Sequence, residues 1–329
     1  TRIGAASDSR RPLSDRLATA AIMLKSHMRP LSRMLGELRE KGAWYIHVSP
    51  FLLTRPHRFR WMAEASVRGL FLLHDLLPIE HPEYFKPGES ARHRARVDTV
   101  LRHAEIVVAN SDSTRRSLRR HAAGEAPRIE VVPLGVSQHF VDRPDVAPVE
   151  AGIPYFVVVG TIEPRKNLEF LLTLWRRWTD HGKRPRARLV IVGRRGWEIE
   201  NVANLLDRSA GLATTVIEVQ ALGDAGMIAL LRGATALIAP SWVEGFGLPI
   251  AEAMALGVPV LASDIDAHRE VGGRFADYIG PLDGRGWMQA LDDYCAADSE
   301  RRRLRLAALR DYRPPVWSAH MARIEELIQ

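Results

Sequence analysis

Two glutamates frame a glycine-containing turn in the second half of the chain. Glu244 precedes the turn, and Glu252 lies in the helix expected after it. Between them, Gly245 and Gly247 permit a tight turn, and Pro249 suits the first turn of a helix. A helix start presents free N–H groups and a positive dipole end to an anion. Because carboxylates repel anions, we expect the glutamates to accept hydrogen bonds from hydroxyl groups, as a nucleotide sugar would offer.

A second candidate lies where another expected strand, 155–159, ends. Gly160 follows this strand, and the adjacent cations Arg165 and Lys166 precede a helix. Adjacent Arg and Lys residues are common on surfaces, but at a strand end they supply two fixed charges for a phosphate group. Both candidates fall at the carboxyl ends of strands, where folds of this kind bind ligands.

The elements that position these residues alternate between strand and helix. In the first half we expect strands at 44–48, 70–73, 106–109 and 129–132, and helices at 92–103 and 113–121. In the second half we expect strands at 155–159, 189–192, 216–219, 236–238 and 258–262. The expected helices there are 168–178, 198–207, 226–231, 249–256, 267–271, 285–296 and 299–309, with a last helix at 316–328. Short apolar strands alternating with helices predict an α/β fold with parallel sheets.

Two further segments have distinct patterns. Residues 141–153 are rich in proline and charge, which predicts an interdomain linker. Residues 1–15 are expected to be irregular, and 17–38 has helical spacing with a break at Pro30. An ordinary helix on a sheet face and a membrane-surface helix both fit that spacing.

Composition limits the classes of function. The 329 residues are 46% hydrophobic, which is enough for two domains, and the net charge is +7. The excess arginine favours anionic lipid or a phosphorylated ligand as a partner, and no motif predicts nucleic-acid binding. Cys295 is the single cysteine, so no intrachain disulfide forms, which fits a reducing cytosol. No signal peptide or apolar run of the roughly 18 residues needed to span a bilayer is expected.

Five segments together resemble the retaining GT-B glycosyltransferases of family 4. Within that family they are similar to the bacterial mannosyltransferase-like branch that assembles O-antigen and exopolysaccharide. The segments that carry the resemblance are 73–84, 109–114, 160–167, 190–197 and 240–255. It implies two Rossmann-like, doubly wound domains that face each other across a cleft. Residues 1–142, joined by the C-terminal helix 313–329, would form the acceptor-side domain, and 143–312 the nucleotide-sugar domain.

The resemblance also implies roles for individual residues. Arg165 and Lys166 would neutralise the departing diphosphate, Glu244 would bind hydroxyls of the donor sugar, and His74 would face that sugar from the first domain. These four are the expected catalytic residues. The expected donor-binding residues are Gly160, Arg165, Lys166, Val219, Leu222, Glu244, Phe246, Gly247, Leu248 and Glu252. Among them, Glu252 would hold the ribose hydroxyls, and the segment 219–222 would line the base.

No metal or other cofactor is expected, because the protein supplies the charge that stabilises the leaving group. We interpret Asp264 and Asp266 as a loop and helix cap rather than a metal-holding pair. His47, His81 and His103 lack the spacing of metal ligands and are expected to be structural. The resemblance implies retention by front-face attack, in which the departing phosphate takes the acceptor proton.

The expected reaction is transfer of mannose from GDP-mannose to a glycan or polyprenyl-linked acceptor. It would occur in the cytoplasm, with peripheral contact to anionic lipid at the inner face of the membrane. A UDP-sugar donor, nucleotide-sugar epimerisation and a non-catalytic binding subunit remain alternatives. Residues 1–40 do not show the glycine-rich loop that family members carry after their first strand, so the acceptor site is left unassigned.

Overall fold

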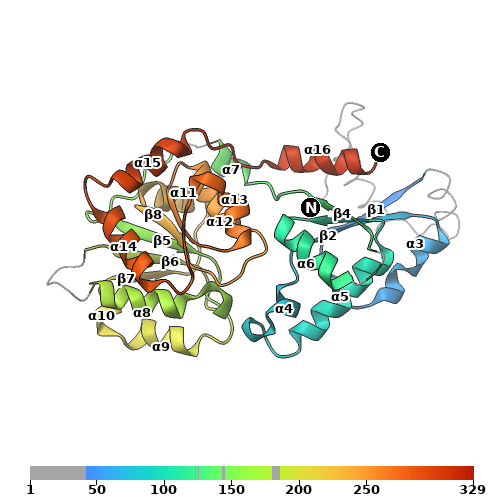
Figure 1. Cartoon of the computed structure of the whole chain (residues 1–329), viewed down its shortest axis with the longest axis horizontal. Coiled ribbons are helices and arrows are strands. Elements are labelled where there is room, and N and C mark those ends of the chain that lie inside the picture. Colours follow the sequence, from blue (N-terminus) through green and yellow to red (C-terminus); the bar gives the residue numbers. More distant parts are fainter. Residues whose placement is uncertain (1–41, 123, 125, 143–144, 180–185) are drawn as a thin grey trace, which may run out of the picture.

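The computed structural model of the protein describes residues 42–122, 124, 126–142, 145–179 and 186–329 of the 329-residue chain. It contains two parallel β-sheets with their helices, which lie side by side along the long axis of the molecule (Figure 1). The predictions for residues 1–15 and for the helix 17–38 with its break at Pro30 lie outside the described residues.

The first sheet has four parallel strands in the order β1-β2-β3-β4. These strands are Trp44–His47, Arg68–Leu73, Ile106–Ala109 and Arg128–Val131. The sequence predicts each of them to within two residues. All four residues of β3 are buried, as expected for a central strand covered by helices on both faces.

The longer helices of this domain are also predicted, and the shortest are not. The helices are α3 (Arg60–Glu64), α4 (Leu77–Glu80), α5 (Glu89–His103) and α6 (Asp112–Ala122), with 3₁₀ turns at Pro56–Phe59 and Pro82–Tyr84. The short helix α7 (Gln138–Val141) lies in the other half of the molecule, where Phe140 packs with Tyr155 and Leu237 of the second sheet. Helices of four or five residues are too short to show a helical repeat in sequence. The start of α6 is fixed by Ser111, whose hydroxyl accepts a hydrogen bond from the Thr114 N–H at 3.0 Å.

The second sheet has six parallel strands in the order β10-β9-β8-β5-β6-β7. In chain order they are β5 (Tyr155–Val159), β6 (Arg188–Val192), β7 (Val216–Val219), β8 (Ala236–Ala239), β9 (Val260–Ser263) and β10 (Asp277–Ile279). Sequence reasoning missed β10, because it is three residues long and begins with a charged residue. Asp277 is nevertheless buried, since Arg301 and Arg305 bind its carboxylate at 2.8 and 2.6 Å.

Helices cover both faces of the second sheet. They are α8 (Leu168–Thr179), α9 (Glu200–Arg208), α10 (Ala210–Ala213), α11 (Asp224–Gly233), α12 (Leu248–Ala255), α13 (Asp266–Gly272), α14 (Gly284–Cys295) and α15 (Glu300–Leu309). Alternate side chains of β5 enter two separate cores: Tyr155 and Val157 pack on one face, and Phe156 and Val158 on the other. Cys295 packs against the second of these cores, and burial raises the pKa of its thiol to about 11.

The last helix, α16 (Trp317–Leu327), joins the two domains. It leaves the second domain and lies against the first sheet (Figure 1). There Ile324 and Leu327 pack with apolar residues of β2 and β3. The two crossing segments run together, because Val136 and Val316 form a parallel bridge. In the described part of the chain, no helix has the length and apolar character needed to cross a bilayer.

Replacement of Ile324 by alanine is expected to lower the free energy of unfolding by about 2–5 kcal/mol, the usual effect of truncating a buried isoleucine. Ile324 is 5% exposed and anchors α16 to the first sheet. Urea unfolding measures the change. Glu326→Ala, at an exposed position of the same helix, is the control and is expected to change stability by about 0.5 kcal/mol or less. Equal stability of the two variants would contradict this packing role.

Candidate active site

The candidate site lies where the strand order of the second sheet reverses. β8 and β5 are neighbours, and the strands continue outward from them in opposite directions. The loops that follow such strands leave a crevice at the carboxyl edge of the sheet. The loop after β5 carries Gly160 and the 3₁₀ turn η3 (Pro164–Lys166), and the loop after β8 carries Glu244. The structure therefore brings the two sequence candidates together at this crevice.

Glu244 is the centre of a buried ion-pair cluster. Its carboxylate accepts hydrogen bonds from Lys166 Nζ at 2.5 Å, from Arg165, and from Ser241 Oγ at 2.8 Å. The Glu244 side chain is only 10% exposed. Burial opposes its ionisation, but the charges of Lys166 and Arg165 outweigh burial and lower the pKa of Glu244 to about 2. Glu244 is therefore ionised at neutral pH and holds both cations at the crevice.

Hydrogen bonds between the loops fix the position of η3. Asn167 ends the turn in the left-handed conformation, with φ of 56°. Its Nδ2 donates to the carbonyl oxygens of Pro240 at 3.0 Å and Pro281 at 3.3 Å. The backbone N–H of Trp242 donates to the carbonyl oxygen of Arg165 at 2.9 Å. These contacts join the loops after β5 and β8 into one unit.

Glu163 is a member of the cluster that the sequence prediction left out. It is 5% exposed, and its carboxylate lies 2.5 Å from Arg165 Nε. Burial raises its pKa, and the opposing charges of Arg165 and Lys166 do not cancel this effect. Its position two residues before Arg165 could have indicated that it belongs to the site, but the sequence does not show that the side chain is buried.

Two glycines permit close approach at the same edge. Gly160 has φ of 137°, and a Cβ there would lie 3.2 Å from Lys166 Cε. A Cβ on Gly193, which follows β6, would lie 1.9 Å from the carbonyl oxygen of Gly160. Side chains at either position would displace Lys166 or the backbone that carries it.

The start of α12 has the predicted geometry. Gly247 precedes the helix in the left-handed conformation, with φ of 105°, and Pro249 lies in its first turn. The Phe246 side chain is buried, at 7% exposed, while Leu248 is partly exposed. Beneath this start lies His268, which the sequence prediction missed because nothing distinguishes a lone helical histidine. It is 1% exposed, and burial lowers its pKa to about 4.

Glu252 lies one turn into α12. Burial and the nearby charge of Asp224 raise its pKa to about 7. Asp224 begins α11, directly after the segment 219–222, so this segment and Glu252 lie in the same region. Within the segment Val219 ends β7, and Leu222 is 39% exposed. From β8 to β7 there are three strand spacings, about 14 Å, which is an extended distance suited to an elongated ligand.

The first domain contacts the Glu244 loop directly. A Cβ on Gly245 would lie 2.9 Å from the His74 carbonyl oxygen and 2.9 Å from Asp75 Cβ. Ser111 Oγ donates to the carbonyl oxygen of Gly245 at 2.7 Å. The exposed side chain of His74 lines a cavity of about 520 Å³ at the ends of β1 and β2. The His74 backbone therefore lies against the loop that carries Glu244.

Two further contacts join the domains, and the first corrects a prediction from sequence. Asp266 makes no capping hydrogen bond; its carboxylate binds Arg116 of the first domain at 2.7 Å. Trp197 donates from Nε1 to the carbonyl oxygen of Tyr84 at 3.1 Å. Glu270 adds a third contact, because it accepts hydrogen bonds from backbone N–H groups at the start of α6.

No group of three or more His, Cys, Asp or Glu residues within the described ranges could hold a metal ion. The Asp264 carboxylate binds Arg269, as Asp266 binds Arg116. Of the histidines at 47, 81 and 103, His47 is buried and hydrogen-bonded to the Tyr45 hydroxyl at 3.0 Å, as a structural histidine would be.

The fold is similar to that of known glycosyltransferases. Residues 145–277 match a family model described as "Glycosyl transferases group 1". In structure, the chain superposes on an OtsA apo structure (TM-score 0.69, 14% identity, covering 90% of this chain and 77% of that one) and on HepE from Anabaena in complex with UDP (TM-score 0.66, 17% identity, covering 90% and 81%). The chain has the GT-B fold, and its residues 145–277 are similar to the glycosyltransferase group 1 family.

Sequence relatives of this GT-B chain include bacterial mannosyltransferases. "Serotype-specific mannosyltransferase WbdA" of Escherichia coli is 28% identical over 270 residues, which cover 76% of this chain and 32% of WbdA. "O-antigen chain mannosyltransferase B" of E. coli is 31% identical over 255 residues, covering 73% and 62%. The chain therefore spans about a third of WbdA and less than two thirds of mannosyltransferase B.

The pH dependence of stability tests the Glu244 cluster. Glu244→Gln leaves Lys166 without its counter-ion and Arg165 with Glu163 alone, and it is expected to cost roughly 3–5 kcal/mol of unfolding free energy at neutral pH. A carboxyl pKa lowered on folding stabilises the protein above its usual value of 4.5, and this stabilisation is lost as the pH falls towards 2. The difference between wild type and variant in urea unfolding should therefore shrink below about pH 4.5.

Glu105→Gln serves as the matched control, because Glu105 forms an exposed ion pair with Arg68. It is expected to cost about 1 kcal/mol or less. A cost for Glu244→Gln that matches the control, or that stays constant down to pH 3, would contradict the buried cluster.

Proposed function

We propose that the protein is a retaining hexosyltransferase that transfers mannose from GDP-mannose to a glycan or polyprenyl-linked acceptor. The observation that carries the proposal is the crevice at the strand reversal. There Glu244 holds Arg165 and Lys166 beside the start of α12, and the His74 backbone of the other domain lies against Gly245. The named mannosyltransferase relatives support mannose as the sugar.

In this proposal each part of the crevice binds one part of the donor. The diphosphate lies near Arg165, Lys166 and the start of α12, and the sugar lies between Glu244 and His74. Glu252 accepts hydrogen bonds from the ribose hydroxyls, and the segment 219–222 lines the base. The spacing from β8 to β7 supports this arrangement, since it allows sugar, diphosphate and nucleoside to lie along the carboxyl edge of one sheet.

The charges suit a transfer in which the sugar becomes cationic and the diphosphate gains negative charge. Arg165 and Lys166 are held in place before the reaction, so they stabilise the leaving group without reorganising. Glu244 and Glu163 offset these cations, which leaves the cluster close to neutral when all four groups are ionised. The raised pKa of Glu163 lets it take up a proton when a diphosphate binds. The protein then supplies the charge stabilisation that a metal ion would otherwise provide.

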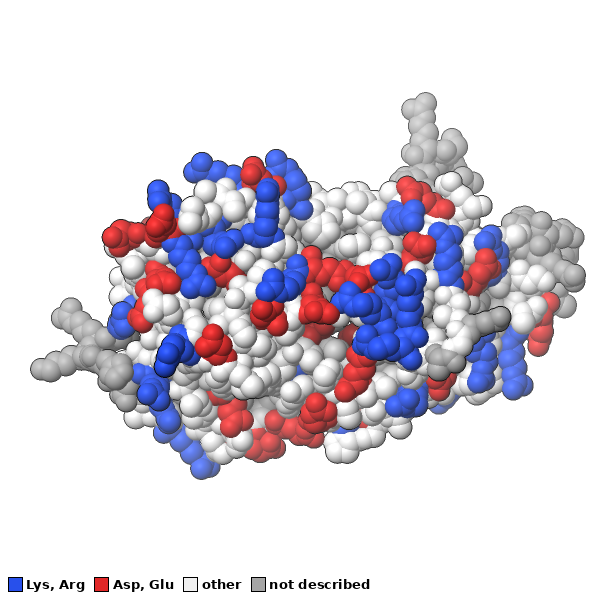
Figure 2. Space-filling model, in the orientation of Figure 1, with Lys and Arg blue, Asp and Glu red and all other residues white. Residues whose placement is uncertain are grey.

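The exposed arginines of the first domain support a peripheral membrane location. Figure 2 shows basic side chains gathered over α6. This helix contributes Arg116, Arg119 and Arg120, all of them exposed. Exposed arginines near a bilayer are attracted to anionic headgroups. In this location the protein would reach a polyprenyl-linked acceptor from the cytoplasmic side.

A UDP-sugar is the rival donor, because structures with this fold are described with UDP or UDP-2-fluoro glucose bound. A thermal-shift screen with GDP, UDP and ADP separates the donors. At a hundred times its Kd, the correct nucleotide stabilises the native state by about 2.7 kcal/mol and raises the Tm. GDP is expected to give the largest shift. A larger shift with UDP would overturn the donor assignment and leave the transferase assignment intact.

Removal of either cation should slow transfer strongly. Arg165→Ala and Lys166→Ala are each expected to lower kcat by about 100-fold or more, because each removes a charge that stabilises the leaving group. The assay follows free GDP and glycosylated acceptor. Arg194→Ala, an exposed arginine on the neighbouring loop, is the control and should keep full activity. An isomerised nucleotide sugar as the product would indicate epimerisation instead.

The raised pKa of Glu252 predicts pH-dependent donor binding. Ionising a buried carboxyl whose pKa is about 7 costs the free protein stability as the pH rises through this value, and hydroxyl donors from the ribose offset that cost. GDP should therefore bind more tightly at pH 8 than at pH 6, with release of a proton. Calorimetry in buffers of different ionisation enthalpy measures both effects.

Phosphate groups also titrate near pH 6, so Glu252→Gln is the necessary control. The variant should bind GDP more weakly at pH 8 and should lose the part of the pH dependence that is centred near 7. An unchanged pH profile in the variant would contradict the ribose assignment.

A further inference from the structure

A second cavity lies beside the ion-pair cluster, outside the proposed donor site. It has a volume of about 550 Å³, within the range of small-molecule sites. Glu163 forms part of its wall, so Arg165 connects the two places: its Nε binds Glu163, and its other end binds Glu244. The remaining wall comes mostly from α8, the start of α9 and the turns before these helices.

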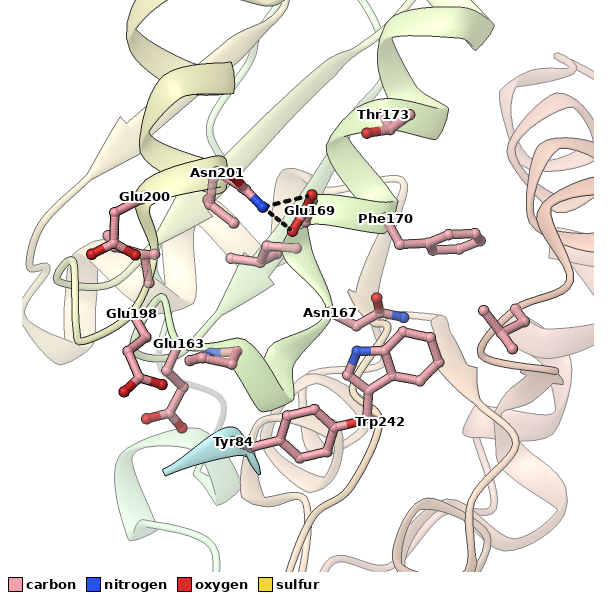
Figure 3. Close-up of a pocket in the computed structure, with 15 residues that line it drawn as sticks. Tyr84, Glu163, Asn167, Glu169, Phe170, Thr173, Glu198, Glu200, Asn201 and Trp242 are labelled. Carbon is pink, nitrogen blue, oxygen red and sulfur yellow. Dashed lines mark hydrogen bonds between the residues drawn. The ribbon is translucent and has the colours of Figure 1, made fainter. Parts of the chain in front are cut away.

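Aromatic rings form one side of this cavity. Trp242 follows β8, Phe170 lies in the first turn of α8, and Tyr84 comes from the first domain. All three are partly exposed. Figure 3 shows their rings on the right and lower sides of the view. Because Tyr84 belongs to the other domain, the cavity is complete only when the domains are in contact.

Hydrogen-bond acceptors form the other side. The carboxylates of Glu163, Glu198 and Glu200 lie on the left of the view in Figure 3. Asn167 also lines the cavity, and its Nδ2 is already used by Pro240 and Pro281, which leaves its amide oxygen as an acceptor. Glu198 has φ of 49°, a costly conformation for a residue other than glycine and one that often marks a binding site.

The lining decides the class of ligand. The described residues that form this wall include four glutamates and no Lys, Arg or His, so a phosphate-bearing ligand is disfavoured. Hydroxyl groups match the acceptors, and the apolar faces of a sugar ring match the aromatic rings. Two of the carboxylates are already engaged, Glu163 by Arg165 and Glu169 by Asn201, which lessens the attraction for a cation.

We propose that this cavity binds a hexose unit of an uncharged glycan chain. The inference rests on the proposed function only in taking that chain to be the acceptor or the growing product. With a sugar unit held here, the chain remains attached to the enzyme beside the reaction centre while the donor is exchanged. A glycan that contacts Glu163 would change the hydrogen bonding of Arg165, which also binds Glu244. Occupation of the cavity would therefore alter the position of the cation beside the diphosphate.

Titration of the protein with mannotetraose in the absence of nucleotide tests the proposal. Binding is followed by tryptophan fluorescence, which reports on Trp242, and by calorimetry. Phe170→Ala removes one ring, and Glu198→Asn removes a carboxylate while keeping a residue that tolerates the left-handed conformation. Each is expected to weaken binding about tenfold. Arg177→Ala, at an exposed position of α8 outside the cavity, is expected to bind like wild type.

Melting temperatures and GDP affinity are measured for every variant. Unchanged GDP affinity in Phe170→Ala and Glu198→Asn shows that the fold and donor site are intact. No saturable binding of mannotetraose to wild type, or equal binding to wild type and both cavity variants, would overturn the proposal. Binding of spermidine in its place, lost in Glu198→Asn, would assign the cavity to a cation instead. Donor choice and transfer are measured in separate assays. A negative result for the proposed function can therefore be distinguished from a lack of glycan binding in this cavity.

Discussion

The salt bridges between Glu244 and the cations Lys166 and Arg165 are the interaction on which the site depends. Three charged side chains are held at the edge of a sheet with little water around them, and each would be costly there alone. Together they fix the loop after β5 to the loop after β8, and the backbone hydrogen bond from Trp242 to Arg165 reinforces that connection. The charge of Glu244 offsets the desolvation cost of the two cations. Both cations are thereby held at the crevice before any ligand binds.

The same loop carries the contact between the domains. Gly245, next to Glu244, lies against His74 and accepts a hydrogen bond from Ser111. Since a side chain at Gly245 would collide with the first domain, the close approach of the domains requires glycine at this position. α16 crosses back to the first sheet, where Ile324 and Leu327 pack, and so forms a second connection between the domains. Domain contact and cation placement therefore depend on the same short stretch of chain.

Most of this architecture could be predicted from sequence, because buried parallel strands have short apolar sequences that alternate with helical segments. The strands from β1 to β9 and the long helices follow that pattern, whereas β10 escapes it, since Asp277 is buried by means of ion pairs with a later helix. At the site, residue types and their place at strand ends indicated Glu244, Arg165 and Lys166. Glu163 and His268 could not be found this way, because their importance depends on burial and on contacts between distant loops. The bounds of the domains and the roles of the site residues stay predictions.

Arg165 connects the crevice at Glu244 with the aromatic cavity beside it. Neither the sequence motif nor the fold suggests this connection. Its guanidinium is planar and donates in two directions, so it binds Glu163 and Glu244 at once. A lysine in its place would offer a compact ammonium group without this planar, two-sided geometry. Since Glu163 lies in the wall of the aromatic cavity and Glu244 at the crevice, a change in the charge or position of either carboxylate alters the electrostatics of the other. Arg165 and Lys166 therefore make different contacts: Arg165 pairs with two carboxylates, whereas Lys166 lies over Gly160 and pairs with Glu244.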